Sequence, residues 1–222
     1  DGLPDTAADE TLVLVPSAEV LLLDAPRVAK QRRQLERAIP FAIEDQLITP
    51  VEQCHVVIVE DSRPNVVGVA VVAKTRMSSW LTRLAEGGVI ADAMIPEGLL
   101  LSADKGSTLL LDDDVATLRW GAAGVMSATP DELKVWLTAI LPNTLTQPLT
   151  VIGGLPTAFE FADDVDINVL PQSALAHVVQ RAAVWPLNGP TLLSEEFAPK
   201  HRKHQGASQW RWAAAVAAMG VV

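Results

Sequence analysis

The residues that could carry out catalysis are few and have no obvious partners nearby in the sequence. Cys54 and His55 are adjacent and could form a thiol–imidazole pair. They lie in an apolar run that predicts a strand, where successive side chains point to opposite faces, so they are not expected to act together. The chain has no GxSxG, HExxH or CxxC motif. No catalytic residue is therefore predicted.

Two glycine-containing turns could approach a phosphate or a nucleotide. The stretch Asp104 to Thr108 reads DKGST, whereas a P-loop needs an earlier glycine and the order Gly-Lys-Ser/Thr, so a hairpin turn is predicted instead. Gly153 and Gly154 end an apolar run and precede a predicted helix, where backbone amides can approach a flat ligand. A tight strand-to-helix turn explains the same glycines and is the favoured interpretation.

Histidines and carboxylates are the remaining candidates for metal binding or acid–base chemistry. His177 lies in an apolar helical pattern that is typical of an interior histidine. His201 and His204 have no carboxylate or thiol beside them and are interpreted as solvated charge. Acidic runs occur at Glu44-Asp45, Asp112 to Asp114 and Asp163-Asp164. Such runs are usually solvated turns or helix ends, so neither a metal site nor a cofactor is predicted.

Charge divides the chain into an acidic body and a basic tail. The 222 residues contain 17 Lys+Arg and 27 Asp+Glu, for a net charge of -10. Four of those cations follow residue 199 and no carboxylate lies beyond Glu196, which leaves 13 cations against 27 anions before the tail. A body this acidic argues against nucleic-acid binding, which depends on neutralising phosphates. Cys54 is the single cysteine, which excludes an intrachain disulfide and favours a reducing compartment.

Apolar periodicity predicts a mixed α/β fold with two sheets. Strands are predicted at 11–15, 20–23, 55–62, 65–75, 91–103, 107–113, 116–121, 123–128, 149–154 and 167–170. Helices are predicted at 27–39 and 41–48 with a kink at Pro40, at 78–88 with a serine cap, and at 129–141 with Thr129 as the cap. Two more are expected at 155–162 and 173–185. A hydrophobic content of 49% supports a packed core.

The residues from 200 onward are typical of entry into a membrane. Residues 213–222 contain no polar side chain, so an amphipathic helix packed on the domain, the alternative, would have no solvent face. Ten residues reach only ~15 Å as a helix, half the hydrocarbon thickness, which predicts a truncated transmembrane helix. Lys/Arg excess marks cytoplasmic flanks, and tryptophan prefers the headgroup region. The predicted membrane-interface residues are Lys200, Arg202, Lys203, Trp210, Arg211 and Trp212. Because Asp1 is not an initiator methionine, the sequence is expected to begin inside a longer chain.

Two phrases of the sequence resemble the protein L family of the bacterial type II secretion system. The first is RQLERAIPFAIEDQL at 33–47 with VEQCH at 51–55, similar to the family's R…LPxxLEdxL…d.e..H run. It follows LVPS at 14–17, similar to the Val-Pro-small end of a family strand. The second is GPTLLSEEFAP at 189–199, similar to the family's NLLxGEFAP phrase near its membrane helix. The resemblance extends over residues 11–222.

The resemblance implies an actin-like (ribonuclease H-like) fold with a degenerate nucleotide site. Gly153 and Gly154 stand where actin-like ATPases cradle adenosine, but the turn from Asp112 through Asp113 to Asp114 lacks the glycine of their second phosphate loop. Turnover is therefore not expected. The expected divisions are 1–90 (a first subdomain without its earliest strands), 91–128 (a β-rich insert), 129–188 (a second subdomain), 189–211 (a basic juxtamembrane linker) and 212–222 (the start of the membrane helix).

The resemblance also implies a non-enzymatic adaptor at the inner membrane. It would recruit the secretion ATPase (protein E) through that enzyme's N-terminal domain and contact proteins M and F, in several copies. It would be a single-pass protein with this part on the cytoplasmic side. Glu44, Asp45, Asp112, Asp113 and Asp114 are the candidate ATPase contacts, although plain solvated charge is the favoured interpretation of these residues. The competing function is an actin-like ATPase or kinase with nucleotide at Gly153-Gly154. A type IV pilus adaptor is disfavoured by the tail.

Overall fold

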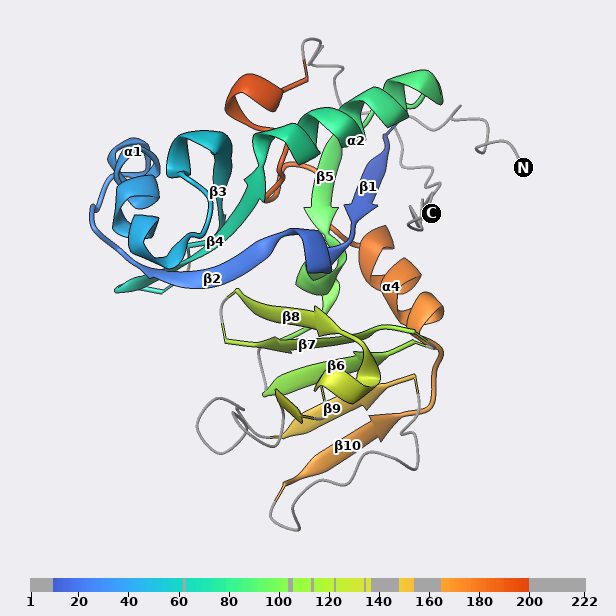
Figure 1. Cartoon of the computed structure of the whole chain (residues 1–222). Helices are drawn as coiled ribbons and strands as arrows, with labels where there is room; N and C mark the ends of the chain where they lie inside the picture. Colours follow the sequence, from blue (N-terminus) through green and yellow to red (C-terminus); the bar gives the residue numbers. More distant parts are fainter. Residues whose placement is uncertain are drawn as a thin grey trace.

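The computed structural model describes residues 10–61, 63–103, 106–112, 114–121, 123–133, 135–136, 148–153 and 165–199 (Figure 1). The strands within these ranges are β1 (Leu12–Val15), β2 (Leu21–Pro26), β3 (Cys54–Glu60), β4 (Val66–Ala73), β5 (Ala93–Pro96), β6 (Ser107–Leu111), β7 (Ala116–Trp120), β8 (Gly124–Ala128), β9 (Leu149–Ile152) and β10 (Ile167–Leu170). The helices are α1 (Arg32–Ala42), α2 (Lys74–Glu86) and α4 (Ala174–Ala183), and short 3-10 turns are η1 (Ser17–Glu19), η2 (Glu44–Gln46), η3 (Val51–Gln53), η4 (Glu97–Leu100) and η5 (Glu195–Phe197).

These strands form two sheets, as predicted. The larger sheet has the order β10-β9-β6-β7-β8-β2-β4-β3, and β1 pairs in parallel with β5 in the smaller one. The β6, β9 and β10 strands are parallel, whereas the pairs from β6 through β3 are antiparallel. The join between β2 and β8 rests on one partner pair, Leu22 and Val125. Figure 1 shows β6 to β10 in the lower half of the view and α1, α2 and β1 to β5 in the upper half.

The two faces of the β2-β4-β3 region are covered by different helices. On one face, Leu35 and Ile39 of α1 pack against a cluster that includes Cys54 and Ile58. On the other face, the residues of α2 with the spacing i, i+3 and i+7, namely Met77, Trp80 and Leu84, join a cluster with Val57 and Val59. The alternation along β3 therefore buries apolar side chains on both faces, which is why its sequence reads as a nearly continuous apolar run.

The first predicted helix was wrong at both ends. It begins at Arg32 rather than Arg27, because the Arg27 amide continues the β2 edge by donating to Asn65 O at 3.0 Å. Pro40 lies inside α1 near its end, where a missing N–H removes one hydrogen bond from the last turn. The predicted second helix at 41–48 is limited to the η2 turn.

Two other boundaries also differ from the prediction. The α2 helix begins at Lys74, directly after β4, and the Ser78 hydroxyl donates to Lys74 O at 2.9 Å instead of capping. The predicted strand at 91–103 ends at Pro96 and continues as η4. Packing in this turn requires glycine at position 98, since a Cβ there would lie 2.5 Å from Val125 Cγ1.

Other local predictions are confirmed. Thr129 and Glu132 form a reciprocal capping box: Thr129 N donates to Glu132 Oε2 at 3.0 Å and Glu132 N to Thr129 Oγ1 at 3.4 Å. The β3–β4 hairpin and the glycine stop after α2 are also present. β6 and β9 pair with one another although they fall in different predicted subdomains. The division of the chain into subdomains stays a prediction.

Candidate functional site

The last described segment, residues 190–199, lies along the free edge of β5; we call it the exit segment. Leu192 N donates to Met94 O at 2.8 Å, and Met94 N donates to Thr191 Oγ1 at 2.9 Å. Leu192 is 0% exposed and Leu193 is also buried, both in the cluster beneath α2. The exit segment is therefore part of the core and not a loose connection.

His55 of β3 fastens the exit segment from the other side. The residue is 2% exposed, and its Nε2 lies 2.8 Å from Leu192 O. A carbonyl oxygen only accepts, so Nε2 carries the hydrogen and donates. The ring also stands edge-on to Phe197, with centroids 4.9 Å apart, and Ser194 Oγ lies 3.4 Å from Nε2. The contact of His55 with Leu192 joins residues 137 positions apart in the sequence.

Burial sets the protonation of this histidine. Desolvation lowers the pKa of His55, although the hydrogen bond to Leu192 O and the charges of Glu195 and Glu196 act in the opposite direction. Burial also lowers the pKa of His177, whose Nδ1 lies 2.5 Å from Gln172 Nε2. Both imidazoles are therefore held neutral in the folded chain at pH values where an exposed histidine begins to gain a proton.

Stability is expected to fall as the pH drops below about 6.5. The unfolded chain binds protons at higher pH than the folded chain, because both folded-state pKa values are lowered. Above that pH the contribution of the neutral histidines is fully present. The variant His55→Gln should show a shallower slope of unfolding free energy between about pH 6.5 and 5.5 in urea titrations. An unchanged slope would contradict this. Burial raises the pKa of Glu97, and this shift changes stability with pH in the opposite direction. The slopes of the two proteins are therefore compared only above about pH 5.5, where an ordinary carboxyl is ionised.

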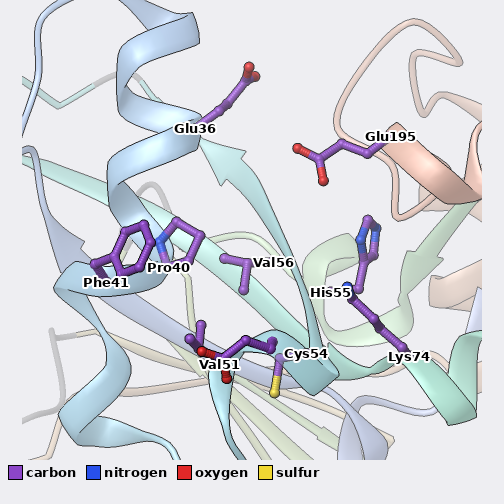
Figure 2. A pocket seen from close by; sticks show the side chains of 10 residues that line it. Glu36, Pro40, Phe41, Val51, Cys54, His55, Val56, Lys74 and Glu195 are labelled. Carbon is purple, nitrogen blue, oxygen red and sulfur yellow. The ribbon is translucent and has the colours of Figure 1, made fainter.

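A pocket opens beside the exit segment, with a volume of about 260 Å³ (Figure 2). It is lined by Glu36, Pro40 and Phe41 of α1, Val51 and Glu52 of η3, Cys54, His55 and Val56 of β3, Lys74 of α2 and Glu195 of η5. Both phrases that carry the family resemblance contribute to it, the first through α1, η3 and β3 and the second through η5. Segments far apart in the sequence thus meet at one place.

The Cys54 thiol is not poised for chemistry in this pocket. It packs in the α1 cluster, whereas His55 faces the exit segment, as strand alternation predicts. Burial is the main cause that raises the pKa of Cys54, and its Sγ lies 3.9 Å from Thr49 O. The thiolate, which is the reactive form, is therefore disfavoured.

Glu195 has the unusual backbone of this site. Its φ of 50° is the one positive value of a non-glycine residue in the described part of the chain. The neighbouring Glu196 pairs with Lys74, with Oε1 and Nζ 3.0 Å apart. The η5 turn therefore holds a strained residue whose side chain faces the pocket (Figure 2).

The variant Glu195→Gly is expected to raise the free energy of unfolding by about 1 kcal/mol, because glycine adopts this backbone without the Cβ clash. The measurement is the urea midpoint at an unchanged m-value. The matched change Glu196→Gly relieves no strain and removes the pair with Lys74, so its midpoint should not rise. A Glu195→Gly midpoint at or below that of the unchanged protein would contradict the strain.

The predicted acidic contacts lie in two separate places. Glu44 and Asp45 are exposed on η2, which follows the end of α1 after a single residue. Asp112 and Asp114 belong to the turn between β6 and β7, which the Asp112 amide closes by donating to Val115 O at 2.9 Å. Strands β8, β2 and β4 separate β7 from β3 in the sheet, so the structure does not gather the two groups. Asp113 lies outside the described residues.

The two glycine turns are explained by packing. Gly153 has a φ of 98°, its N–H donates to Gln172 O at 3.1 Å, and a Cβ would lie 1.9 Å from Leu111 O. Its amide is therefore not free to bind a phosphate, and Gly154 lies outside the described residues. The hairpin prediction around Gly106 was wrong, because η4 and not a paired strand precedes β6. Gly106 instead approaches Pro148, whose oxygen would lie 2.1 Å from a Cβ.

The predicted membrane residues from Lys200 to Trp212, and the apolar run after them, lie outside the described residues. None of the described helices has the length and apolar character that a membrane span requires. Among the described residues no group of three or more His, Cys, Asp or Glu side chains could hold a metal ion.

The architecture is an actin-like mixed α/β fold, as expected from the resemblance. The chain is similar to the cytoplasmic domain of EpsL, an inner membrane component of the type II secretion system of Vibrio cholerae, with a TM-score of 0.72, 19% identity and 84% of this chain and 78% of that chain covered. It is also similar to a chain of the PilM-PilN type IV pilus biogenesis complex, with a TM-score of 0.52, 13% identity and coverages of 79% and 81%. At these identities the likeness concerns the fold.

The family model for type II secretion system (T2SS), protein L matches residues 3–200, and the chain belongs to this family. A type II secretion system protein L of Pectobacterium carotovorum subsp. carotovorum is 30% identical over 172 residues, covering 74% of this chain and 39% of the relative. One of Klebsiella pneumoniae is 26% identical over 204 residues, covering 90% and 48%. The chain thus spans less than half the length of these relatives.

Proposed function

We propose that this chain is a non-enzymatic adaptor that holds the secretion ATPase, protein E, at the cytoplasmic face of the inner membrane. It links the ATPase to the platform proteins M and F and works in several copies. Membership of the protein L family supports this proposal. The structural observation that carries it is the exit segment, whose Leu192 and Leu193 are buried in the core.

A buried exit segment is what an adaptor needs. The tail that follows residue 199 carries the predicted lipid-facing cations and tryptophans, which would bind the bilayer. Because the segment before it is bonded to both β5 and His55, a force that arrived at residue 199 would be passed on to the folded domain. A flexible linker would not transmit orientation in this way.

The proposal predicts direct binding of the ATPase's N-terminal domain to this chain, with a Kd of about 1 μM or lower. Calorimetric titration of the two purified pieces measures it. Absence of heat, with no shift in a parallel spectroscopic titration, at concentrations about a hundredfold above that Kd would contradict the proposal.

We expect no stabilisation by ATP with magnesium. The Gly153 amide is already bonded to Gln172 O at 3.1 Å, so it is not available to a phosphate. A bound nucleotide would raise the melting temperature by mass action, so a thermal-shift assay measures this directly. A concentration-dependent rise would instead favour the actin-like ATPase or kinase alternative.

A further inference from the structure

The pocket beside η5 combines an open aromatic wall with an aliphatic floor. Phe41 at the end of α1 is 72% exposed, although it is a large apolar side chain. Pro40, Val51 and Val56 line the pocket next to it (Figure 2). An exposed ring beside an open aliphatic cavity is a typical anchor point for a protein partner.

Carboxylates surround this apolar floor. In Figure 2, the Glu195 carboxylate points from η5 toward α1, and Glu36 of α1 extends upward, away from Pro40 and Val56. Glu52 of η3 is a third lining carboxylate. The pocket is therefore open to a guest that is apolar along its length and positively charged at its tip.

The local ion pairs leave negative charge available at this site. Glu36 is paired with Arg32 at 2.7 Å, and Lys74, the cation in the lining, is paired with Glu196 at 3.0 Å. Within the described part of the chain, neither Glu52 nor Glu195 has an ion-pair partner within 4.0 Å. The unneutralised charge of the pocket is thus negative, which favours a cationic guest and repels an anionic one.

We propose that this pocket receives an arginine or lysine side chain presented by the ATPase's N-terminal domain, an inference that rests on the proposed function. The aliphatic stem would lie on Pro40 and Val56, where long cationic side chains commonly bury their methylene groups. The charged head would lie between Glu36 and Glu195, where charge-assisted hydrogen bonds are strong. The Phe41 ring adds packing and a cation–π contact.

The structure assigns the proposed ATPase contact to a smaller surface than the sequence could. Acidity alone selected Glu44-Asp45 and the β6–β7 turn, none of whose residues lines this pocket. The pocket joins carboxylates to an apolar surface, and complementary interfaces gain affinity from the combination of a packed anchor with a charge pair.

The test is calorimetric titration of the ATPase's N-terminal domain into variants of this chain. Glu52→Lys with Glu195→Lys should weaken binding at least tenfold, and Phe41→Ala about fivefold. The matched control, a double variant that changes the net charge by the same amount, is Glu86→Lys with Glu10→Lys, two exposed carboxylates that do not line the pocket. It alters long-range charge without touching the pocket and should change the Kd less than about twofold. The loss in the pocket variant should shrink at high salt.

The outcomes separate the two proposals. Absence of binding by the unchanged chain overturns the proposed function itself. Normal binding by the unchanged chain and by the double variant overturns the pocket and leaves the adaptor role intact. Loss caused instead by Asp112→Lys with Asp114→Lys, or by Glu44→Lys with Asp45→Lys, likewise overturns the pocket and assigns the contact to that surface. If charge reversal impairs folding, the double variant Glu52→Gln with Glu195→Gln replaces it, because glutamine has the shape of glutamate without its charge. Undiminished binding by this variant would overturn the pocket.

Discussion

Replacing Gly153 by alanine is expected to lower the free energy of unfolding by about 3 kcal/mol or more, or to prevent folding. Gly153 directly follows β9, beside the end of β6, and a Cβ would lie 1.9 Å from Leu111 O. The clash is with backbone, so no side-chain rotation relieves it. A φ of 98° adds strain for any L-residue with a Cβ.

Gly88 provides the matched control for this change. It has a φ of 70°, and no atom lies within 4 Å of the place that a Cβ would occupy, so Gly88→Ala should cost only about 1 kcal/mol from backbone strain. Urea unfolding of both variants measures the difference. Equal costs would show that Gly153 is not needed for packing against Leu111 and would revive a ligand-binding role for this turn.

The change His55→Ala should lower the free energy of unfolding by about 3 kcal/mol. It removes one of the two hydrogen bonds to Leu192 O, which still accepts from the Ser194 amide at 2.9 Å, and the loss of one such bond costs about 0.5–1.5 kcal/mol. It also removes the ring that packs against Phe197 and leaves a cavity in the core. We therefore expect the exit segment to open before the rest of the domain.

Hydrogen exchange at the Leu192 amide, which bonds to Met94 O, reports this opening. Protection there should fall in His55→Ala by more than it falls in the β3–β4 hairpin. The control is Ser194→Ala, which loses a longer contact of 3.4 Å and should cost less than about 1 kcal/mol. Unchanged protection of Leu192 would contradict the role of His55 in holding the segment.

The sequence predicts the elements that local patterns determine. The alternation through β3 and β4 and the capping box at Thr129 were readable because each depends on neighbours along the chain. The start of α1 could not be predicted, because it depends on contacts with the β3–β4 hairpin. The Arg27 side chain donates to Arg63 O at 3.0 Å and pairs with Asp61. Tertiary contacts there override helical propensity.

The sequence identified the segments that form the candidate site but not the contacts between them. Two phrases pointed to the family, but nothing in their spacing showed that His55 would meet Leu192 across 137 residues. The pocket depends on that meeting, because Glu195 lines it from one phrase and Glu36 from the other. The acidic runs that were chosen as candidate contacts include neither Glu36 nor Glu195. The positive φ of Glu195 could not be predicted from the sequence, because residues other than glycine rarely adopt it.

The most direct test of the adaptor role is flotation of the ATPase with vesicles into which the full-length protein has been reconstituted. We expect the ATPase to rise with these vesicles, to stay at the bottom with protein-free vesicles of the same lipid composition, and to rise without added nucleotide. An ATPase that remains at the bottom in both cases, although the protein is properly inserted, would contradict the central claim.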